Sequence, residues 1–242
     1  IQPKVIDPDM VSDIHEIGGT ILGSSRGPQD VGKMVDRLMD FGINILFCIG
    51  GDGTLHGAQE IYQEVTKRGL NIAVIGIPKT IDNDISFIEK TFGFETAFSI
   101  AVDSIRSAHV EAKGALNGVG LVKLMGRESG YIAANAAMAS QDVNFCLIPE
   151  EHFDLEGPNG LYEHLKKRLT NRGHAVIVVA EGAGQRFVSQ SGTDASGNVK
   201  FGDVGVFLRE DLKRYFKSIN VPINIRYIDP SYIIRSARAI PS

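Results

Sequence analysis

Short apolar runs alternate with amphipathic helical patterns along most of this 242-residue chain. Runs of about four to eight apolar residues predict buried strands, whereas apolar residues spaced by three or four predict helices. Because strands that alternate with helices form parallel sheets through right-handed crossovers, we expect an α/β fold with a doubly wound, parallel sheet and flanking helices. The expected strands are 43–49, 71–75, 119–124, 143–148, 174–180 and 223–228, and the expected helices are 31–39, 55–68, 96–115, 131–139, 161–169 and 204–216.

The composition is that of a globular chain for which small anions are better candidate ligands than polymers. A hydrophobic content of 43% is enough for a substantial core, and the net charge of −4 disfavours a general nucleic-acid or acidic-membrane surface. No apolar run is long enough to span a bilayer, and no signal-peptide pattern is present. Cys48 and Cys146 lie in apolar runs without ligand spacing, so we interpret them as reduced core residues of a cytoplasmic protein.

A polar segment, residues 76–84 with the sequence GIPKTIDND, directly follows the second expected strand. Open α/β sheets bind their ligands at the carboxyl ends of strands. Asp82 and Asp84 are two residues apart and would face the same way in an extended segment, with Thr80 and Lys79 beside them. One carboxylate there can take a proton from an attacking hydroxyl while the threonine and lysine hold a phosphate in transfer. An ordinary turn built from Pro, Asn and Asp is the alternative.

Two glycine-rich segments are candidate phosphate sites. Residues 50–54, GGDGT, connect the first expected strand to a helix. Such glycines admit an anion to backbone amides, the helix N-terminus adds partial positive charge, and Asp52 can hold a magnesium ion. Tight packing of the turn is the alternative. Arg26, in the segment 17–28, can also meet a phosphate, although a connecting loop explains that segment equally well.

Two further strand ends carry charged side chains. Arg127 is placed to contact an anionic substrate, with helix capping as the alternative. Glu181 can accept hydrogen bonds from a polyol. Because Asp52, Asp82, Arg127 and Glu181 all follow expected strands, we expect them to share one edge of the sheet. This clustering favours a functional interpretation over four separate structural ones.

Five motifs together resemble those of 6-phosphofructokinase, and the resemblance extends from about residue 18 to residue 235. The pattern is most similar to the plant and kinetoplastid ATP-using branch, which is close to the pyrophosphate-using enzymes. The combination of 78–84 with 125–127 is highly specific, whereas the GGDGT turn is similar to one in NAD kinases and diacylglycerol kinases. The motifs are 50–54, 78–84, 123–127, 180–182 and 227–235.

The resemblance implies a two-lobed fold and a glycolytic kinase that moves the γ-phosphoryl group of ATP to the 1-hydroxyl of fructose 6-phosphate. It assigns roughly residues 18–115 to nucleotide binding and the catalytic loop, and 116–242 to sugar-phosphate binding. It also implies a Mg²⁺ cofactor and a cytoplasmic, allosteric homo-oligomer, either a dimer or a tetramer, without nucleic-acid or membrane partners.

The resemblance further implies roles for individual residues. Asp82 would be the base that deprotonates the sugar hydroxyl, with Asp84 in support, and Thr80, Lys79 and Arg127 would complete the catalytic group. Asp52 would hold magnesium, and Arg226 would reach a neighbouring subunit's sugar phosphate. The nucleotide site would contain Arg26, Gly51, Gly53, Thr54 and Gly57. The fructose 6-phosphate site would contain Thr80, Asp82, Asp84, Met125, Gly126, Arg127, Glu181, Tyr232 and Arg235.

The choice of phosphoryl donor depends on Gly53. Pyrophosphate-using relatives carry Asp there, and a carboxylate would repel and crowd the α-phosphate of ATP, so Gly favours ATP. Lys79 is the residue expected in pyrophosphate users, but the plant and kinetoplastid enzymes combine Gly with Lys. The alternatives are a pyrophosphate-dependent phosphotransferase and a non-catalytic, sugar-phosphate-binding fragment or regulatory subunit.

The chain also departs from the family pattern. Residues 1–17 lack the family's opening strand and nucleotide loop, and the family continues well beyond Ser242. We therefore expect a fragment that is truncated at both ends. Gly118 stands where many bacterial relatives place a second inter-subunit arginine.

Overall fold

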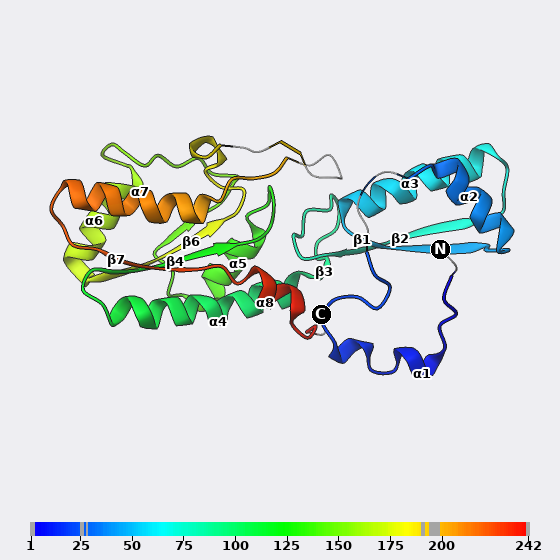
Figure 1. The fold of residues 1–242 in the computed structure, drawn as a ribbon, viewed down its shortest axis with the longest axis horizontal. Helices are drawn as coiled ribbons and strands as arrows, with labels where there is room; N and C mark the ends of the chain where they lie inside the picture. The colour runs from blue at the N-terminus through cyan, green and yellow to red at the C-terminus, as the bar shows by residue number, and fades with distance from the viewer. Residues whose placement is uncertain (1–2, 25–26, 28, 190–191, 194–198, 241–242) are drawn as a thin grey trace.

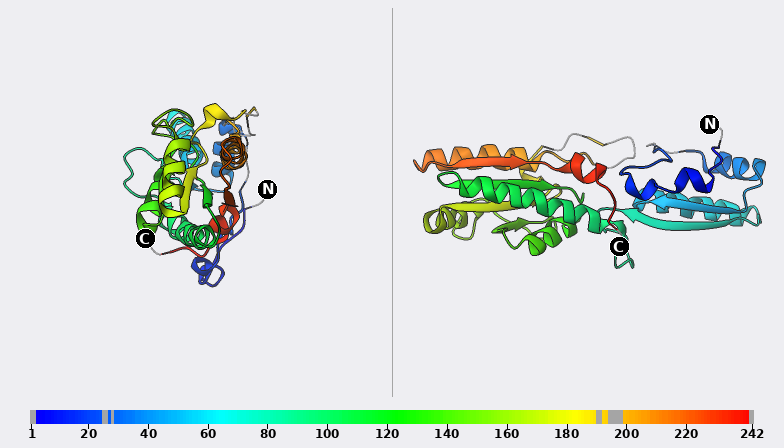
Figure 2. Two further views of the ribbon diagram at one scale, coloured as in Figure 1. Left: turned by 90° about the vertical axis from the view of Figure 1, so that its left-hand side faces the viewer. Right: turned by 90° about the horizontal axis from the view of Figure 1, so that it is seen from below.

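The computed structural model describes residues 3–24, 27, 29–189, 192–193 and 199–240, and the chain forms two lobes along one long axis (Figures 1 and 2). Every pairing between its named strands is parallel. The strands are β1 Ile45–Gly50, β2 Ala73–Thr80, β3 Phe92–Gly93, β4 Gly118–Leu124, β5 Phe145–Leu147, β6 His174–Ala180 and β7 Asn224–Ile228. The α/β fold class is therefore confirmed.

The strands belong to two sheets rather than one. The first lobe holds a sheet of order β1-β2-β3, and the second lobe holds a sheet of order β5-β6-β4-β7. The prediction that the candidate residues share one sheet edge is therefore wrong, because the chain leaves the first sheet after Gly93. The helices are α1 Pro8–Val11, α2 Val31–Asp40, α3 Asp52–Lys67, α4 Phe94–Lys113, α5 Tyr131–Ser140, α6 Leu161–Arg172, α7 Val204–Ser218 and α8 Ser231–Ser236, with short 3₁₀ turns at Ile14–Glu16 and Gln185–Phe187.

The first sheet is covered by helices on one face. Val35 of α2 and Ile61 and Val65 of α3 are buried against it. On the other face Phe47 and Ile49 are 57% and 50% exposed. Exposed residues alternate with less exposed residues along β1. Most parallel sheets are covered on both faces, so this lobe has an open apolar surface.

The second sheet is covered on both faces. Its central strands β4 and β6 are almost wholly buried. The connection from β4 to β5 runs toward one edge of the sheet, whereas those from β5 to β6 and from β6 to β7 run toward the other edge. Because such crossovers are right-handed, α5 lies on one face of the sheet, and α6 and α7 lie on the other. Tyr162 of α6 stacks on Tyr215 of α7 with ring centroids 4.1 Å apart. Figure 1 shows α4 and α7 on opposite sides of the sheet.

Helix α4 belongs by packing to the second lobe. Its residues Ala97, Ala101 and Ile105 are fully buried in the core that also contains β4 and β6. The functional division of the chain into a nucleotide part and a sugar-phosphate part at about residue 115 remains a prediction. Helix α4, which precedes that point, packs with the residues that follow it.

Local sequence signals account for several boundaries. Asp30 caps α2 as its sequence predicts, and its carboxylate accepts a hydrogen bond from the amide of Lys33 at 3.1 Å. Helix α3 begins at Asp52, three residues earlier than expected, with Gly51 at its N-cap. Strand β2 continues to Thr80, beyond the Gly-x-Pro sequence that was expected to end it, because Pro78 still lies in register beside β1.

Both cysteines are free, but neither is a core residue. Cys146 is exposed on β5, which is an edge strand, and Cys48 is only partly buried on β1. Their interpretation as core residues is therefore wrong. Within the described part of the chain, no helix combines the length and apolarity needed to cross a membrane.

Candidate active site

The loop that follows β2 carries Asp82 and is held by Asn83. The backbone of Asn83 is left-handed, with φ of 56°. Its side-chain oxygen accepts a hydrogen bond from the amide of Thr91 at 2.8 Å. The Thr91 hydroxyl lies 3.2 Å from the same oxygen and donates to the carbonyl of Thr80 at 2.8 Å. The segment is therefore not extended as predicted, and Asp82 is partly buried while Asp84 is exposed.

Asp82 lies among charges of both signs. Burial raises the pKa of its carboxyl to about 6, and the negative charges of Asp84 and Glu181 act in the same direction. The positive charges of Arg127 and Arg235 oppose this rise in pKa. A carboxyl group with a pKa near neutrality beside two guanidinium groups is suited to exchange a proton with a bound anionic ligand.

Arg127 occupies a strained loop after β4. Its φ is 52°, and the preceding Gly126 has φ of 132°. The Arg127 amide donates a hydrogen bond to Glu181 Oε1 at 2.9 Å, and the Glu181 amide donates to the carbonyl of Leu124 at 2.8 Å. A Cβ atom on Gly182 would lie 2.0 Å from the Arg127 carbonyl oxygen, so glycine is required there. One oxygen of Glu181, expected to bind a polyol, is thus already used to hold Arg127.

A hydrogen bond joins the loop after β2 to the loop after β4. The Ser129 hydroxyl donates to the backbone carbonyl of Asp82 at 3.0 Å, and Ser129 is 7% exposed. The carboxyl ends of β2 and β4 therefore meet, although they belong to different sheets.

The GGDGT turn lies beside the same loop. A Cβ atom on Gly51 would come within 3.3 Å of Thr80 Cβ, which places the start of α3 next to the end of β2. Asp52 is the first residue of α3 and is exposed. Gly53 and Gly57 have open space where a Cβ would point, whereas Gly50 is packed tightly against Thr54. Backbone amides at a helix N-terminus beside open space favour anion binding.

The other predicted residues have different positions. Arg235 on α8 is near enough to lower the pKa of Asp82, while Tyr232 on the same helix is 85% exposed. Met125 is 5% exposed and packs in the core below the Arg127 loop. Lys79 is exposed on β2.

Arg226 is not brought to this group. It lies on β7 opposite Gly120, at the edge of the second sheet, and its Nε is 3.6 Å from a carboxylate oxygen of Glu111. Its side chain is 53% exposed, so its inter-subunit role remains a prediction. Arg26, expected at the nucleotide site, lies outside the described residues.

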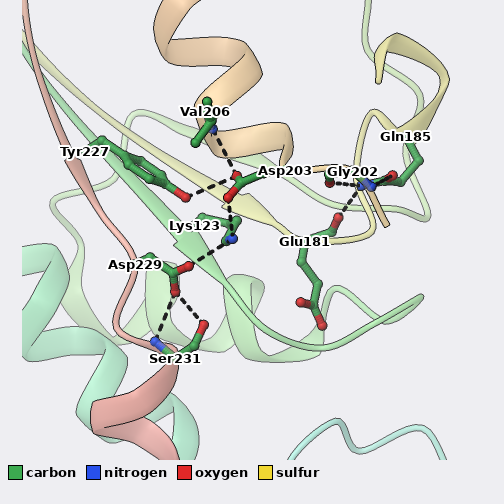
Figure 3. Close-up of polar contacts among 9 residues, drawn as sticks. All are labelled: Lys123, Glu181, Gln185, Gly202, Asp203, Val206, Tyr227, Asp229 and Ser231. Carbon is green, nitrogen blue, oxygen red and sulfur yellow. Dashed lines mark hydrogen bonds and ion pairs between the residues drawn. The ribbon is translucent and has the colours of Figure 1, made fainter. Parts of the chain in front are cut away.

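The sequence reasoning missed the residues that support the site. Ser129 and Asn83 have no pattern that distinguishes them from ordinary turn residues. Lys123 had a detectable signal, because it is a charged residue inside the apolar run of β4. Its ammonium group lies between the carboxylates of Asp203 and Asp229, as Figure 3 shows.

Fold and site together define a two-lobed, parallel α/β protein with a candidate anion-binding site where the strands of both lobes end. The family model for phosphofructokinase matches residues 2–242, so the chain belongs to the phosphofructokinase family. The resemblance based on the sequence motifs is thereby confirmed.

Named relatives agree with this membership. The chain is 52% identical over 242 residues to the ATP-dependent 6-phosphofructokinase of Borreliella burgdorferi, with 97% of this chain and 54% of the relative covered. It is 53% identical over 230 residues to the ATP-dependent 6-phosphofructokinase of Trypanosoma brucei brucei, with 93% of this chain and 47% of the relative covered. The chain therefore spans about half the length of these relatives.

Solved structures share the fold. The pyrophosphate-dependent phosphofructokinase of Marinobacter aquaeolei is similar with a TM-score of 0.73 at 23% identity, over 96% of this chain and 57% of that chain. The T-state phosphofructokinase of Pichia pastoris is similar with a TM-score of 0.73 at 21% identity, over 97% of this chain and 25% of that chain. At these identities the likeness supports the fold alone.

Proposed function

We propose that the protein transfers the γ-phosphoryl group of ATP to the 1-hydroxyl of fructose 6-phosphate, which gives fructose 1,6-bisphosphate and ADP. The observation that carries this proposal is the environment of Asp82. Its carboxyl group has a pKa raised to about 6, chiefly by burial, and it lies within the electrostatic reach of Arg127 and Arg235. The names of the similar curated proteins point to the same reaction.

Asp82 acts as the base in this proposal. At neutral pH a carboxyl group with a pKa near 6 is mostly ionised, yet it is a stronger base than an ordinary aspartate. It takes the proton of the sugar hydroxyl as the oxygen bonds to phosphorus, and the bond to the leaving ADP oxygen breaks. Thr80 and Lys79 hold the phosphoryl group in flight, and Arg127 stabilises its negative charge.

The sugar phosphate is bound by the second lobe in this proposal. Arg127 and Arg235 supply charge for its anionic group, and the free oxygen of Glu181 accepts a hydroxyl hydrogen bond. Tyr232 is exposed on the same helix as Arg235 and is free to pack on the ligand. Asp84 remains an exposed supporting carboxylate.

The nucleotide is bound at the start of α3, where Gly51, Gly53, Thr54 and Gly57 line the approach. Magnesium usually keeps several waters and binds through one or two carboxylates together with substrate phosphates. Asp52 fits this donor set, because it is an exposed carboxylate in the first turn of α3. When bound there, magnesium neutralises charge on the phosphates.

Donor choice is tested by a direct comparison. The open space at Gly53 supports ATP, while Lys79 keeps pyrophosphate as the second candidate donor. Purified complete gene product is assayed with fructose 6-phosphate and either MgATP or magnesium pyrophosphate. We expect turnover with ATP, and faster turnover with pyrophosphate would reverse the donor assignment.

A non-catalytic role is tested in the same preparation. Thermal shift titrations with fructose 6-phosphate and with MgATP report binding independently of turnover. Stabilisation by both ligands together with product formation is expected. Stabilisation by the sugar phosphate alone, with no product from either donor, would identify a binding subunit.

Assembly and location complete the proposal. We propose a cytoplasmic homo-oligomer, a dimer or a tetramer, in which the exposed Arg226 reaches the sugar phosphate of a neighbouring subunit. The mass of the protein in solution, measured with and without an Arg226→Ala substitution, tests the oligomeric state and whether Arg226 is needed to form it.

A further inference from the structure

Lys123 links three segments of the second lobe that carry candidate sugar-phosphate residues. Its Nζ lies 3.1 Å from Asp203 Oδ2 and 2.9 Å from Asp229 Oδ2, and its side chain is only 13% exposed (Figure 3). Burial acts to lower the pKa of Lys123, but hydrogen bonds to Asp229 and Asp203 outweigh it and raise that pKa. The lysine is thus charged and shared between two carboxylates.

The first carboxylate belongs to the segment that ends beside Glu181. Asp203 caps α7 by accepting a hydrogen bond from the amide of Val206 at 3.0 Å. The preceding residue, Gly202, exchanges two hydrogen bonds of 3.0 Å with the side chain of Gln185. The same Gln185 amide donates to the carbonyl of Glu181 at 2.6 Å. Lys123 is therefore connected to the Glu181 backbone through Asp203 and one glutamine.

The second carboxylate fixes the helix that carries Arg235. Asp229 accepts hydrogen bonds from the amide of Ser231, at 3.1 Å, and from its hydroxyl, and Ser231 is the first residue of α8. Lys123 itself lies four residues before Arg127 on the continuous chain of β4 and its following loop. One ammonium group thus connects the Arg127 loop to the helix of Arg235.

Removal of this positive charge would leave two carboxylates, with side chains 43% and 34% exposed, on either side of the position of the mostly buried ammonium group. The two carboxylates would lose the cation that compensates their charges and would repel each other, and solvent would screen this repulsion only in part. Asp203 is held by α7 and Tyr227, whose hydroxyl donates to it at 3.2 Å. The α8 side is the less anchored part, because Ile234 is its only buried residue among those described. Repulsion would therefore displace α8 rather than α7.

We propose that Lys123 is a positioning residue that holds Arg235 and Tyr232 at the correct distance from Arg127 for sugar-phosphate binding. This inference rests on the proposed function. It assigns no contact between Lys123 and substrate, and it predicts an effect on the sugar-phosphate site without an effect on the nucleotide site, because α3 lies in the other lobe.

The kinetic test uses the complete gene product with Lys123→Met, which removes the charge at similar length. We expect KM for fructose 6-phosphate to rise about tenfold or more, while KM for ATP stays within about twofold. Because Arg235 lowers the pKa of Asp82, its displacement should also move the acid limb of the rate profile to higher pH. An unchanged KM for the sugar phosphate, or an equal rise in both KM values, would overturn the proposal.

Two variants serve as controls. Lys123→Arg keeps the charge and should restore most of the sugar-phosphate affinity. Lys166→Met removes an exposed lysine of α6 that pairs with Glu163 of its own helix, at 3.7 Å, and should leave both KM values unchanged. If Lys123→Met fails to fold, Asp229→Asn carries the same test, because it keeps the cap on Ser231 and removes one ion pair.

A second measurement does not require turnover. Hydrogen exchange of the α8 amides should become about tenfold faster in Lys123→Met, while exchange in α3 stays unchanged. Faster α8 exchange in a protein that does not use fructose 6-phosphate would support the positioning role of Lys123 and reject the proposed function. Unchanged exchange in α8 would reject the positioning role itself.

Discussion

The hydroxyl of Ser129 donates a hydrogen bond to the backbone carbonyl of Asp82 at 3.0 Å, and this contact joins the loop after β2 to the loop after β4. The two strands belong to different sheets. The loops that carry the proposed base, Asp82, and the proposed anion-binding residue, Arg127, are therefore joined by a direct hydrogen bond.

Replacement of Ser129 by alanine tests this link. The Asp82 carbonyl would lose its partner, at a cost of about 1 kcal/mol, and the Asp82 loop would lose its fixed position relative to Arg127. We expect kcat to fall about tenfold with KM for ATP unchanged, as measured by steady-state kinetics. Ser140→Ala is the matched control, because the Ser140 hydroxyl donates to the carbonyl of Ala137 within its own helix. Equal kcat values for the two variants would contradict the role of the link.

The raised pKa of Asp82 predicts an acid limb centred near pH 6 in the profile of kcat/KM for fructose 6-phosphate. Below this pH the base is protonated, and the rate should fall about tenfold per pH unit. Glu181→Gln keeps an oxygen that can accept from the Arg127 amide but removes a charge that raises this pKa. The limb should therefore move to lower pH in that variant. A limb centred near pH 4 in the unmodified protein would contradict the assignment.

The same pKa predicts that Asp82 lowers the stability of the fold at neutral pH. Its folded-state pKa of about 6 exceeds the ordinary value of 3.8, so the folded state binds more protons between these values. Stability therefore declines as pH rises through this window and is constant above it. Asp82→Asn should raise the free energy of unfolding by about 1–3 kcal/mol at pH 7.5. Chemical denaturation at pH 7.5 and pH 4 should show this gain at the higher pH only.

The sequence predicted the second lobe better than the first. Strand β6 matches its expected range, and β4 differs by one residue, because their apolar runs are buried on both faces. In the first lobe β2 extends five residues beyond its apolar run through Gly76 and Pro78. There the pairing with β1 decides the strand end, and that pairing is not visible in the local sequence.

The candidate site was predicted in its residues but not in its geometry. The spacing of Asp82 and Asp84 suggested that both carboxylates face the same way. In the structure the backbone of Asn83 between them is left-handed, and Asp82 is partly buried whereas Asp84 is exposed. The partners of Lys123 lie 80 and 106 residues away, so no local pattern identifies them. Local spacing can indicate chemistry, whereas these long-range contacts depend on the fold.

Gly53 provides a test of donor choice. It lies in the first turn of α3, and in the described part of the chain no atom outside its own turn lies within 4 Å of the position a Cβ would take. Gly53→Asp places a carboxylate beside the proposed phosphate site, where like-charge repulsion should reduce kcat/KM for ATP about tenfold or more. Gly53→Asn, which has similar size and no charge, separates repulsion from crowding. Equal losses in the two variants would show that crowding, and not charge, determines the effect.

The most direct test of the account is the turnover number of Asp82→Asn in the complete gene product, measured with saturating fructose 6-phosphate and MgATP. Asparagine keeps the shape of the side chain but cannot accept the proton of the sugar hydroxyl. The account predicts a loss of kcat of about a thousandfold or more, while the sugar phosphate still binds in a thermal shift titration. A turnover number equal to that of the unmodified protein would contradict the role of Asp82 as the base.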